Sequence, residues 1–248
     1  MLQGHAQIKI RILLKTTEMQ KEPSKDAIIR LLKTKSSMKQ DVYERTLAVF
    51  QMLRSVIKEI TSDLSKESGK SDKRINIVFT DKGEFELELK VAGDVLFFHM
   101  HTNVFEFDRS HQIRKSSYVK EDESRSYCGQ ISIYNFLADS FKYNRVNDVG
   151  YLIGRLFVNK EQHYFVEGRK QLGFLYNDFS KNVLDKEMIR KVVEAAILYC
   201  LEFDLYAPPF DAIRELKVAE ILETSLNMKV QTGKRLGFRF QSEGEPGD

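Results

Sequence analysis

The stretch EFELELKV, residues 84–91, alternates charged and apolar side chains without a fault. On an extended strand, side chains two positions apart share a face, so Phe85, Leu87, Leu89 and Val91 lie together and the charged side chains lie opposite. This period of two is typical of a strand with one face in the core and one in water. Parallel sheets are covered on both faces, so the pattern predicts an antiparallel sheet.

Short turns flank this strand on both sides. DKG, residues 81–83, joins it to INIVFT, and AGD, residues 92–94, joins it to VLFFHMH. Turns this short connect antiparallel neighbours, so we expect three consecutive antiparallel strands between residues 75 and 107. SYCGQISIYNFL looks like a further strand, and GYLIGRLFV and HYFVEG look like a hairpin around NKEQ. The sequence therefore predicts a meander of about five or six strands over residues 75–168.

The segment before the sheet has a helical period. Ser24 is the expected N-cap of a short helix, and a longer helix is expected to begin at Ser36 or Ser37 and end near Ser65. Its apolar residues form one stripe: Val42, Val49, Leu53, Val56, Ile60 and Leu64. We interpret the stripe as a core-covering face. The alternative is a homodimer seam along the helix 37–65. The polar stretch 65–74 is interpreted as a linker.

Helical patterns return after the sheet. Asp185 can cap a helix running to Phe203, a second helix is expected over 211–226, and residues 231–240 are expected to add an edge strand. We therefore predict an α+β fold in which an antiparallel meander sheet of about five or six strands is packed by N- and C-terminal helices. The expected organisation is one domain, 1–248, with a helical segment 1–68, a sheet 75–168, C-terminal helices 185–229 and a disordered tail 241–248.

Composition restricts the environment and the partners. The 39 basic and 36 acidic side chains give a net charge of +3, which lacks the concentrated basic footprint of a nucleic-acid binder. A weak nucleic-acid site is kept as an alternative at Lys234, Arg235 and Arg239, with Phe238 and Phe240. Two cysteines give no disulfide framework, which favours a reducing compartment. Because no apolar run approaches the ~20 residues of a membrane span, we expect a cytoplasmic protein without a membrane partner.

The stretch GDVLFFHMHTNVFEF, residues 93–107, places two histidines on one face of a strand. It resembles the first motif of cupins, small β-barrel metalloproteins, in the order of Gly93, His99, His101 and Glu106. The resemblance implies a divalent metal held by His99, His101 and Glu106, in a metal-dependent enzyme. The family motif continues to a glycine where this chain has Ile113. The alternative is that both histidines extend an apolar strand face, and we expect no other cofactor.

Other candidate catalytic groups are less specific. Cys128 could be a thiolate served by His101 or His111, although a lone cysteine on a strand is usually a small core residue. Asp139, Asp148 and Glu167 could pair as acid and base, but their spacing does not single them out. Whether the chain is an enzyme is left open at this point.

Residues 127–151 are rich in tyrosine and phenylalanine, with asparagine and arginine interleaved, which is the composition of recognition surfaces. The preceding polar stretch, 108–126, is long for a connection. We expect it to be a surface loop that covers a pocket, is mobile unless something holds it, and has Tyr118 as its apolar anchor. We therefore predict a binding or adaptor module for a protein or small ligand. The predicted contact residues are His111, Arg114, Tyr118, Tyr134, Asn135, Tyr143, Asn144 and Arg145.

The run SYCGQISIYNFLADSFKYNRVNDVGYLIGRLF, residues 126–157, is similar to an uncharacterised conserved family of proteins from Bacteroidota-type bacteria. This resemblance implies a bacterial protein and carries no assigned activity with it.

Overall fold

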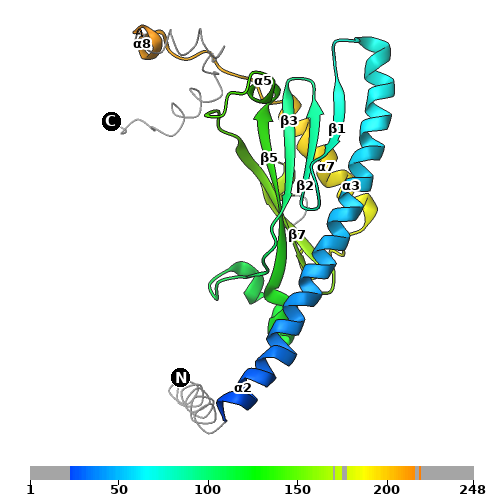
Figure 1. Cartoon of the computed structure of the whole chain (residues 1–248), viewed down its shortest axis with the longest axis vertical. Coiled ribbons are helices and arrows are strands. Elements are labelled where there is room, and N and C mark those ends of the chain that lie inside the picture. Colours follow the sequence, from blue (N-terminus) through cyan, green and yellow to red (C-terminus); the bar gives the residue numbers. More distant parts are fainter. Residues whose placement is uncertain (1–22, 170, 175–177, 216–217, 219–248) are drawn as a thin grey trace.

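The computed structural model of the chain describes residues 23–169, 171–174, 178–215 and 218. It is an α+β structure in which a long N-terminal helix and a C-terminal helix pack on an antiparallel sheet (Figure 1). The sheet order is β1-β2-β3-β5-β6-β7, and the short strand β4 pairs with the start of β5. The strands are β1 (Ile77–Asp81), β2 (Glu86–Val91), β3 (Asp94–Met100), β4 (Phe105–Glu106), β5 (Tyr127–Leu137), β6 (Tyr151–Asn159) and β7 (Tyr164–Gly168).

The alternation in residues 86–91 has the predicted consequence. Leu87, Leu89 and Val91 are buried, and the charged residues between them lie on the other face of β2. The turns on both sides of β2 join it to antiparallel neighbours, so the predicted three-strand meander between residues 75 and 107 is confirmed.

The N-terminal helix is longer than predicted. It runs without a break from α2 (Ser24–Leu31) through a π-helical turn (Leu32–Ser36) into α3 (Ser37–Ser71). Pro23, and not Ser24, is its N-cap, and Ser36 has helical backbone angles, so the predicted second start is wrong. The predicted linker from residue 65 is also wrong as far as Ser71. Each residue added to an existing helix fixes only its own backbone angles and gains one hydrogen bond. Polar residues can therefore extend a helix that is already formed.

The apolar stripe of α3 packs inside this chain. Val42, Val49, Leu53, Val56 and Ile60 are buried, and all but Val42 belong to a core shared with the sheet and with α7 (Lys186–Leu201). These side chains therefore cover the core, as the first interpretation predicted. Because they are buried in this chain, they are not available for a dimer seam. As predicted, the Asp185 side chain caps α7, accepting a hydrogen bond from the Met188 amide at 2.7 Å.

The remaining described elements are short. They are the turns η2 (Gln112–Lys115) and η3 (Glu123–Ser126), with the helices α4 (Ser117–Glu121), α5 (Ala138–Lys142), α6 (Gln171–Phe174) and α8 (Phe210–Ile213). Three predicted elements lie wholly or mostly outside the described residues: most of the helix 211–226, the strand 231–240 with its basic residues, and the tail 241–248. Within the described part of the chain, no helix combines the length and the apolar character needed to cross a membrane.

Candidate functional site

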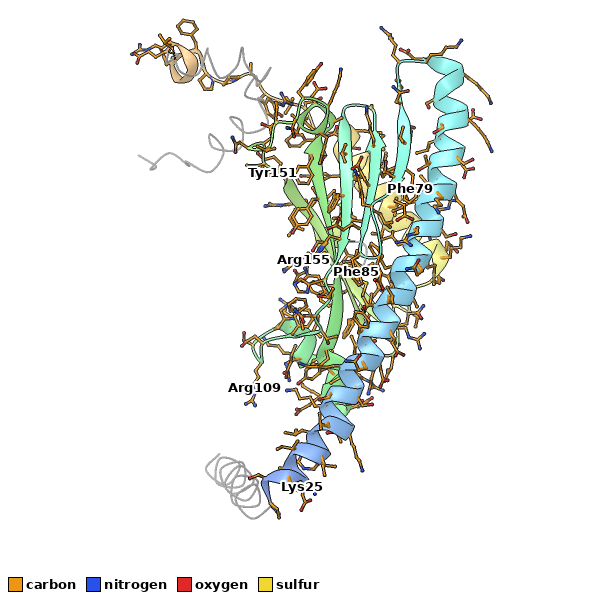
Figure 2. All side chains as sticks on the ribbon, viewed as in Figure 1. Lys25, Phe79, Phe85, Arg109, Tyr151 and Arg155 are labelled. Carbon is orange, nitrogen blue, oxygen red and sulfur yellow. The ribbon has the colours of Figure 1, made fainter. Side chains whose placement is uncertain are left out.

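Among the described residues, no long helix covers the sheet face opposite α3 and α7 (Figure 1). Across five strands, one row of paired residues on this open face consists of Glu86, His99, Ser132, Arg155 and Glu167. The neighbouring row consists of Glu88, Phe97, Tyr134 and Leu152. Arg155 projects from the side of the molecule away from α3 (Figure 2). In the part of the chain that the structure describes, residues 107–126 cover one end of this face and residues 138–150 cover the other.

The first of these covers was predicted to be a mobile loop, and the structure shows that it is held in place. Val119 is buried against Cys128, Phe157, Phe165 and Phe179. The Ser116 hydroxyl caps α4 by accepting a hydrogen bond from the Val119 amide. Most of the segment is short helix and turn, so its backbone bonds are made locally while Val119 fixes it to the sheet. The low apolar content of residues 108–126 concealed this, because three side chains, the buried Val119 and the partly buried Ile113 and Tyr118, make the apolar contact.

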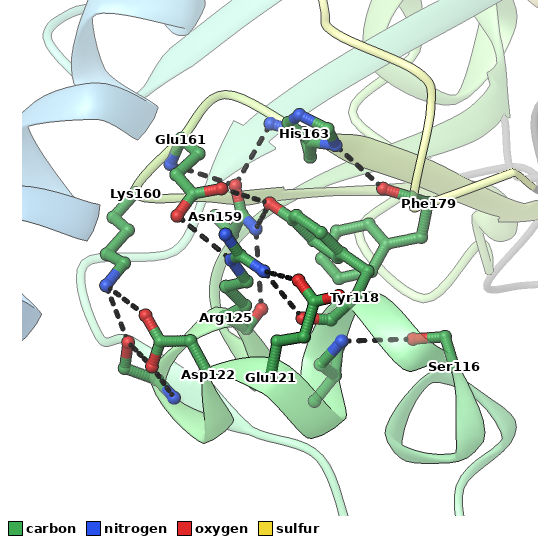
Figure 3. Close-up of polar contacts among 12 residues, drawn as sticks. Ser116, Tyr118, Glu121, Asp122, Arg125, Asn159, Lys160, Glu161, His163 and Phe179 are labelled. Carbon is green, nitrogen blue, oxygen red and sulfur yellow. Dashed lines mark hydrogen bonds and ion pairs between the residues drawn. The ribbon is translucent and has the colours of Figure 1, made fainter.

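Tyr118 anchors the segment, as predicted, through its ring and its hydroxyl (Figure 3). The hydroxyl donates to Glu161 Oε2 at 2.7 Å and accepts from Asn159 Nδ2 at 2.9 Å. The ring stacks on His163, and the Arg125 guanidinium lies over it at 4.3 Å. Burial, above all, raises the pKa of Tyr118. All of these partners come from this chain, so the Tyr118 hydroxyl is already engaged and offers little to a ligand.

A second set of bonds ties the end of the segment to the β6–β7 turn. Lys160 Nζ lies 2.8 Å from Asp122 Oδ2 and 2.6 Å from the Ser124 hydroxyl. The lysine bond, aided by Ser124, holds the pKa of Asp122 at about 2. Arg125 donates to Glu161 Oε1 at 3.0 Å. Together with Tyr118, these bonds make the segment a fixed wall at one end of the open face.

His111 and Arg114 were predicted to contact a ligand. Arg114 instead bonds Glu106 and the carbonyl of Phe107, the latter at 2.8 Å. The His111 Nδ1 accepts from the Ile113 amide, and its Nε2 lies 3.6 Å from Glu167 Oε1. The structure therefore places His111 at the edge of the open face, beside the Arg155–Glu167 pair. Arg114 supports the wall.

The predicted metal ligands are not assembled. His99 and His101 lie on the open face, with ring centroids 6.4 Å apart, and both line a cavity of about 310 Å³. Glu106 lies on the α3 side of the sheet, where it accepts from the Tyr127 hydroxyl at 2.6 Å and lies 3.9 Å from Lys35. The Tyr127 bond is the main reason why the pKa of Glu106 is lowered. No group of three His, Cys, Asp or Glu side chains that could hold a metal ion occurs among the described residues.

The hydrogen bonding of His101 also disfavours coordination. Its Nδ1 accepts from the Asn103 amide at 3.0 Å, so the proton of the neutral ring belongs on Nε2. A histidine that binds metal through Nε2 usually donates a proton from Nδ1 to a partner. The turn at residues 102–103 therefore favours the tautomer of His101 with its proton on Nε2, which is the opposite of the one that a histidine bound to metal through Nε2 requires.

The other catalytic candidates are dispersed. Cys128 is fully buried, and burial raises the pKa of its thiol, so a reactive thiolate is disfavoured. Asp148 pairs with Arg145, and Glu167 pairs with Arg155. Asp139 is exposed on α5. Asp148 and Glu167 are thus tied to different arginines and do not form an acid–base pair.

The second cover, residues 138–150, has a buried polar support. Arg145 Nε lies 3.0 Å from Asp148 Oδ2, and the Ser140 hydroxyl donates to the same oxygen at 2.7 Å. The Arg145 amide also donates to the Ser140 carbonyl at 2.8 Å. Arg145 and Asn135 are buried, so these two predicted contact residues are internal supports. Tyr134 and Tyr143 are partly exposed and Asn144 is exposed, in a left-handed conformation with φ 49°.

Around this support lies an apolar surface that the sequence interpretation missed. Phe141, Val146, Val149 and Leu152 are between 42% and 74% exposed. The Phe141 ring contacts Phe136, with centroids 5.4 Å apart, and Leu152 is paired with Tyr134. We call Tyr134, Phe141, Val146, Val149 and Leu152 the α5 surface. The two valines lie within the otherwise polar run NRVNDV. Apolar residues in a polar loop were the sequence feature that could have indicated an exposed apolar surface.

Comparison of the chain with models of protein families, with curated proteins and with solved structures gave no match. The similarity to a bacterial family therefore stays a prediction, and the function has to be argued from the geometry.

Proposed function

We propose that this protein is a non-catalytic binding module that attaches to a protein partner through the α5 surface. The observation that carries this proposal is the exposure of Phe141, Val146 and Val149 on a segment whose backbone is fixed by the buried Arg145–Asp148 pair, together with the exposure of Leu152 on the adjoining strand β6. Contiguous exposed apolar side chains typically mark interaction sites in monomeric proteins.

The energetics favour a protein partner. Fully burying an aliphatic or aromatic side chain contributes roughly 1.5–3 kcal/mol, so a few such side chains can supply the centre of an interface. The fixed backbone limits the entropy lost on binding. Asp139, Lys142, Asn144 and Asn147 are exposed in the same segment and would supply the polar rim that surrounds such a centre.

Binding is favoured over catalysis because the candidate reactive groups are already engaged. The Cys128 thiol is buried, and Asp148 and Glu167 each pair with an arginine of this chain. The α5 surface, by contrast, offers apolar area and needs no titrating group.

Site-specific crosslinking tests this proposal. A photoreactive phenylalanine analogue is placed at Phe141 in one sample and at Val78 in another, because Val78 is a similarly exposed apolar residue on β1. We expect a discrete crosslinked protein from position 141 after irradiation in an extract of the source cells, and none from position 78. Adding Leu152→Arg to the chain labelled at position 141 should remove the product. Identical products from both positions, or a product insensitive to Leu152→Arg, would refute the proposal.

A further inference from the structure

Residues 24–36 form a helical arm that extends beyond the sheet (Figure 1). No residue of α2 is buried, and Ile28, Ile29, Leu31 and Leu32 are between 38% and 58% exposed. Isolated helices of this length are marginal in water, and most helical stability comes from packing an apolar face. The α2 arm therefore presents an apolar face for which the described residues supply no cover.

The apolar face of the arm is broad. At about 100° per residue, Leu31, Ile28, Leu32 and Ile29 span an arc of roughly 160°. Arg30 and Lys33 lie beyond its edge at Ile29, and Lys25, near the start of the arm, falls within the arc; all three are exposed. A lysine in this place can keep its carbon chain among apolar groups while its ammonium group reaches the headgroups. The seam of a two-stranded coiled coil is narrower, because only two positions in seven face the partner helix. A broad apolar arc with basic residues on the polar face is typical of helices that lie in a membrane interface.

Charge distinguishes between the two partners that could cover such a helix. Residues 24–36 contain four cationic side chains, Lys25, Arg30, Lys33 and Lys35, against one acidic side chain, Asp26, which gives +3. Lys35 lies 3.9 Å from Glu106 and over the Tyr127 ring, whereas Lys25 and Lys33 are exposed. Two arms packed together would bring like charges close. An anionic lipid surface would attract them.

We propose that the α2 arm docks this protein on the surface of an anionic lipid bilayer. Ile28, Leu31 and Leu32 enter the boundary between headgroups and acyl chains, and Lys25 and Lys33 contact the lipid phosphates. No membrane partner is expected from the sequence, because it contains no run of ~20 apolar residues. A helix lying in the interface needs no such run, so this proposal agrees with the lack of a spanning helix in the described part of the chain.

Co-sedimentation of the full chain with vesicles tests the proposal. We expect binding to phosphatidylcholine vesicles containing about one third phosphatidylglycerol, weak binding to phosphatidylcholine alone, and release by salt. The double change Leu31→Ser with Leu32→Ser should lower the partition coefficient about tenfold or more. The control is Leu198→Ser with Leu201→Ser, since these α7 leucines are 48% and 53% exposed, against 46% and 58% for Leu31 and Leu32. This control should bind like the unaltered chain.

Changing the charges tests the electrostatic part separately. Lys25→Gln with Lys33→Gln should weaken binding to the anionic vesicles and leave the weak binding to phosphatidylcholine alone unchanged. Because the chain contains no tryptophan, Ile28→Trp provides a single fluorescent reporter in the arm. Its emission should shift to shorter wavelength with anionic vesicles, while a tryptophan at Leu198 should not shift.

Three results would overturn the proposal. The first is failure of the full chain to bind anionic vesicles, and the second is equal binding by the Leu31→Ser, Leu32→Ser variant. The third is a lack of vesicle binding together with a concentration-dependent dimer in lipid-free sedimentation velocity that this variant abolishes. That result would assign the arm to a second copy of the chain.

Discussion

At the scale of single residues, Gly129 sets how closely α3 approaches the sheet. A Cβ at this position would lie 2.1 Å from Thr46 Oγ1 and 2.7 Å from Thr46 Cβ, so helix and strand would have to separate. We expect Gly129→Ala to lower the free energy of unfolding by about 1–3 kcal/mol, the usual cost of overpacking a core. Urea unfolding followed by circular dichroism measures the change.

Gly93→Ala is the matched control, because a Cβ there would meet no atom within 4 Å. Its effect should stay within about 0.5 kcal/mol. Combining Gly129→Ala with Thr46→Ala should recover part of the loss, since it removes two of the three close atoms. Equal stability of the Gly129→Ala and Gly93→Ala proteins would show that the close approach of α3 is not required.

Single residues also show where prediction from the sequence fails. Leu87 and Leu89 were placed correctly, because in a strand the period alone assigns each side chain to a face. Arg145 and Asn135 were predicted as surface residues and are buried. Composition favours an exposed arginine, and only the folded loop shows that Asp148 neutralises it. Glu106 was grouped with the histidines on motif order, yet the chain takes it to the other side of the sheet, beside Tyr127.

At the scale of elements, structure that depends on neighbouring residues was predicted from the sequence, whereas structure that depends on tertiary contacts was not. Strands β1 to β3 follow from alternation and turn residues within the segment itself. The order of residues 107–126 depends on contacts with β6, β7 and the chain near Phe179, which are distant in the sequence. No local pattern reports such contacts, so the segment was interpreted as mobile.

Tyr118→Phe tests what holds this segment. Removing the hydroxyl takes away the donor to Glu161 and the acceptor of Asn159, a fully buried side chain. We expect a loss of about 1–2 kcal/mol in the free energy of unfolding, because the buried amide loses its closer partner. Hydrogen exchange followed by mass spectrometry should show faster exchange between residues 112 and 126, with the centre of β5 unchanged. Tyr206→Phe is the control, since Tyr206 is exposed.

If residues 112–126 exchange equally fast in the unaltered chain and in Tyr118→Phe, the wall does not depend on the tyrosine. Such a result would also weaken the assignment of this segment as a fixed edge of the open face.

At the scale of the whole molecule, the two proposed surfaces lie at opposite ends. The α2 arm lies at one end of the sheet and α5 at the other (Figure 1). A protein docked on lipid through the arm would hold the α5 surface away from the bilayer by the length of the sheet. This arrangement suits an adaptor that presents a partner near a membrane, and it allows each surface to be tested without disturbing the other.

The α2 arm and α3 form one continuous helix, but we expect the arm to contribute little to the free energy of unfolding of the protein. α3 packs on the core through Val49, Leu53 and Val56, whereas α2 has no buried residue. Proline in a helix interior costs about 3 kcal/mol or more where the helix cannot fray. We therefore expect Ser55→Pro, at an exposed position of α3, to lower the free energy of unfolding by at least that amount. Ile29→Pro should change it by less than about 0.5 kcal/mol, because unwinding of the arm exposes no core. Thermal and urea unfolding of both variants measure the difference. Similar losses for the two would mean that the arm is stabilised together with the core, and the arm would then be a poor candidate for an independent docking element.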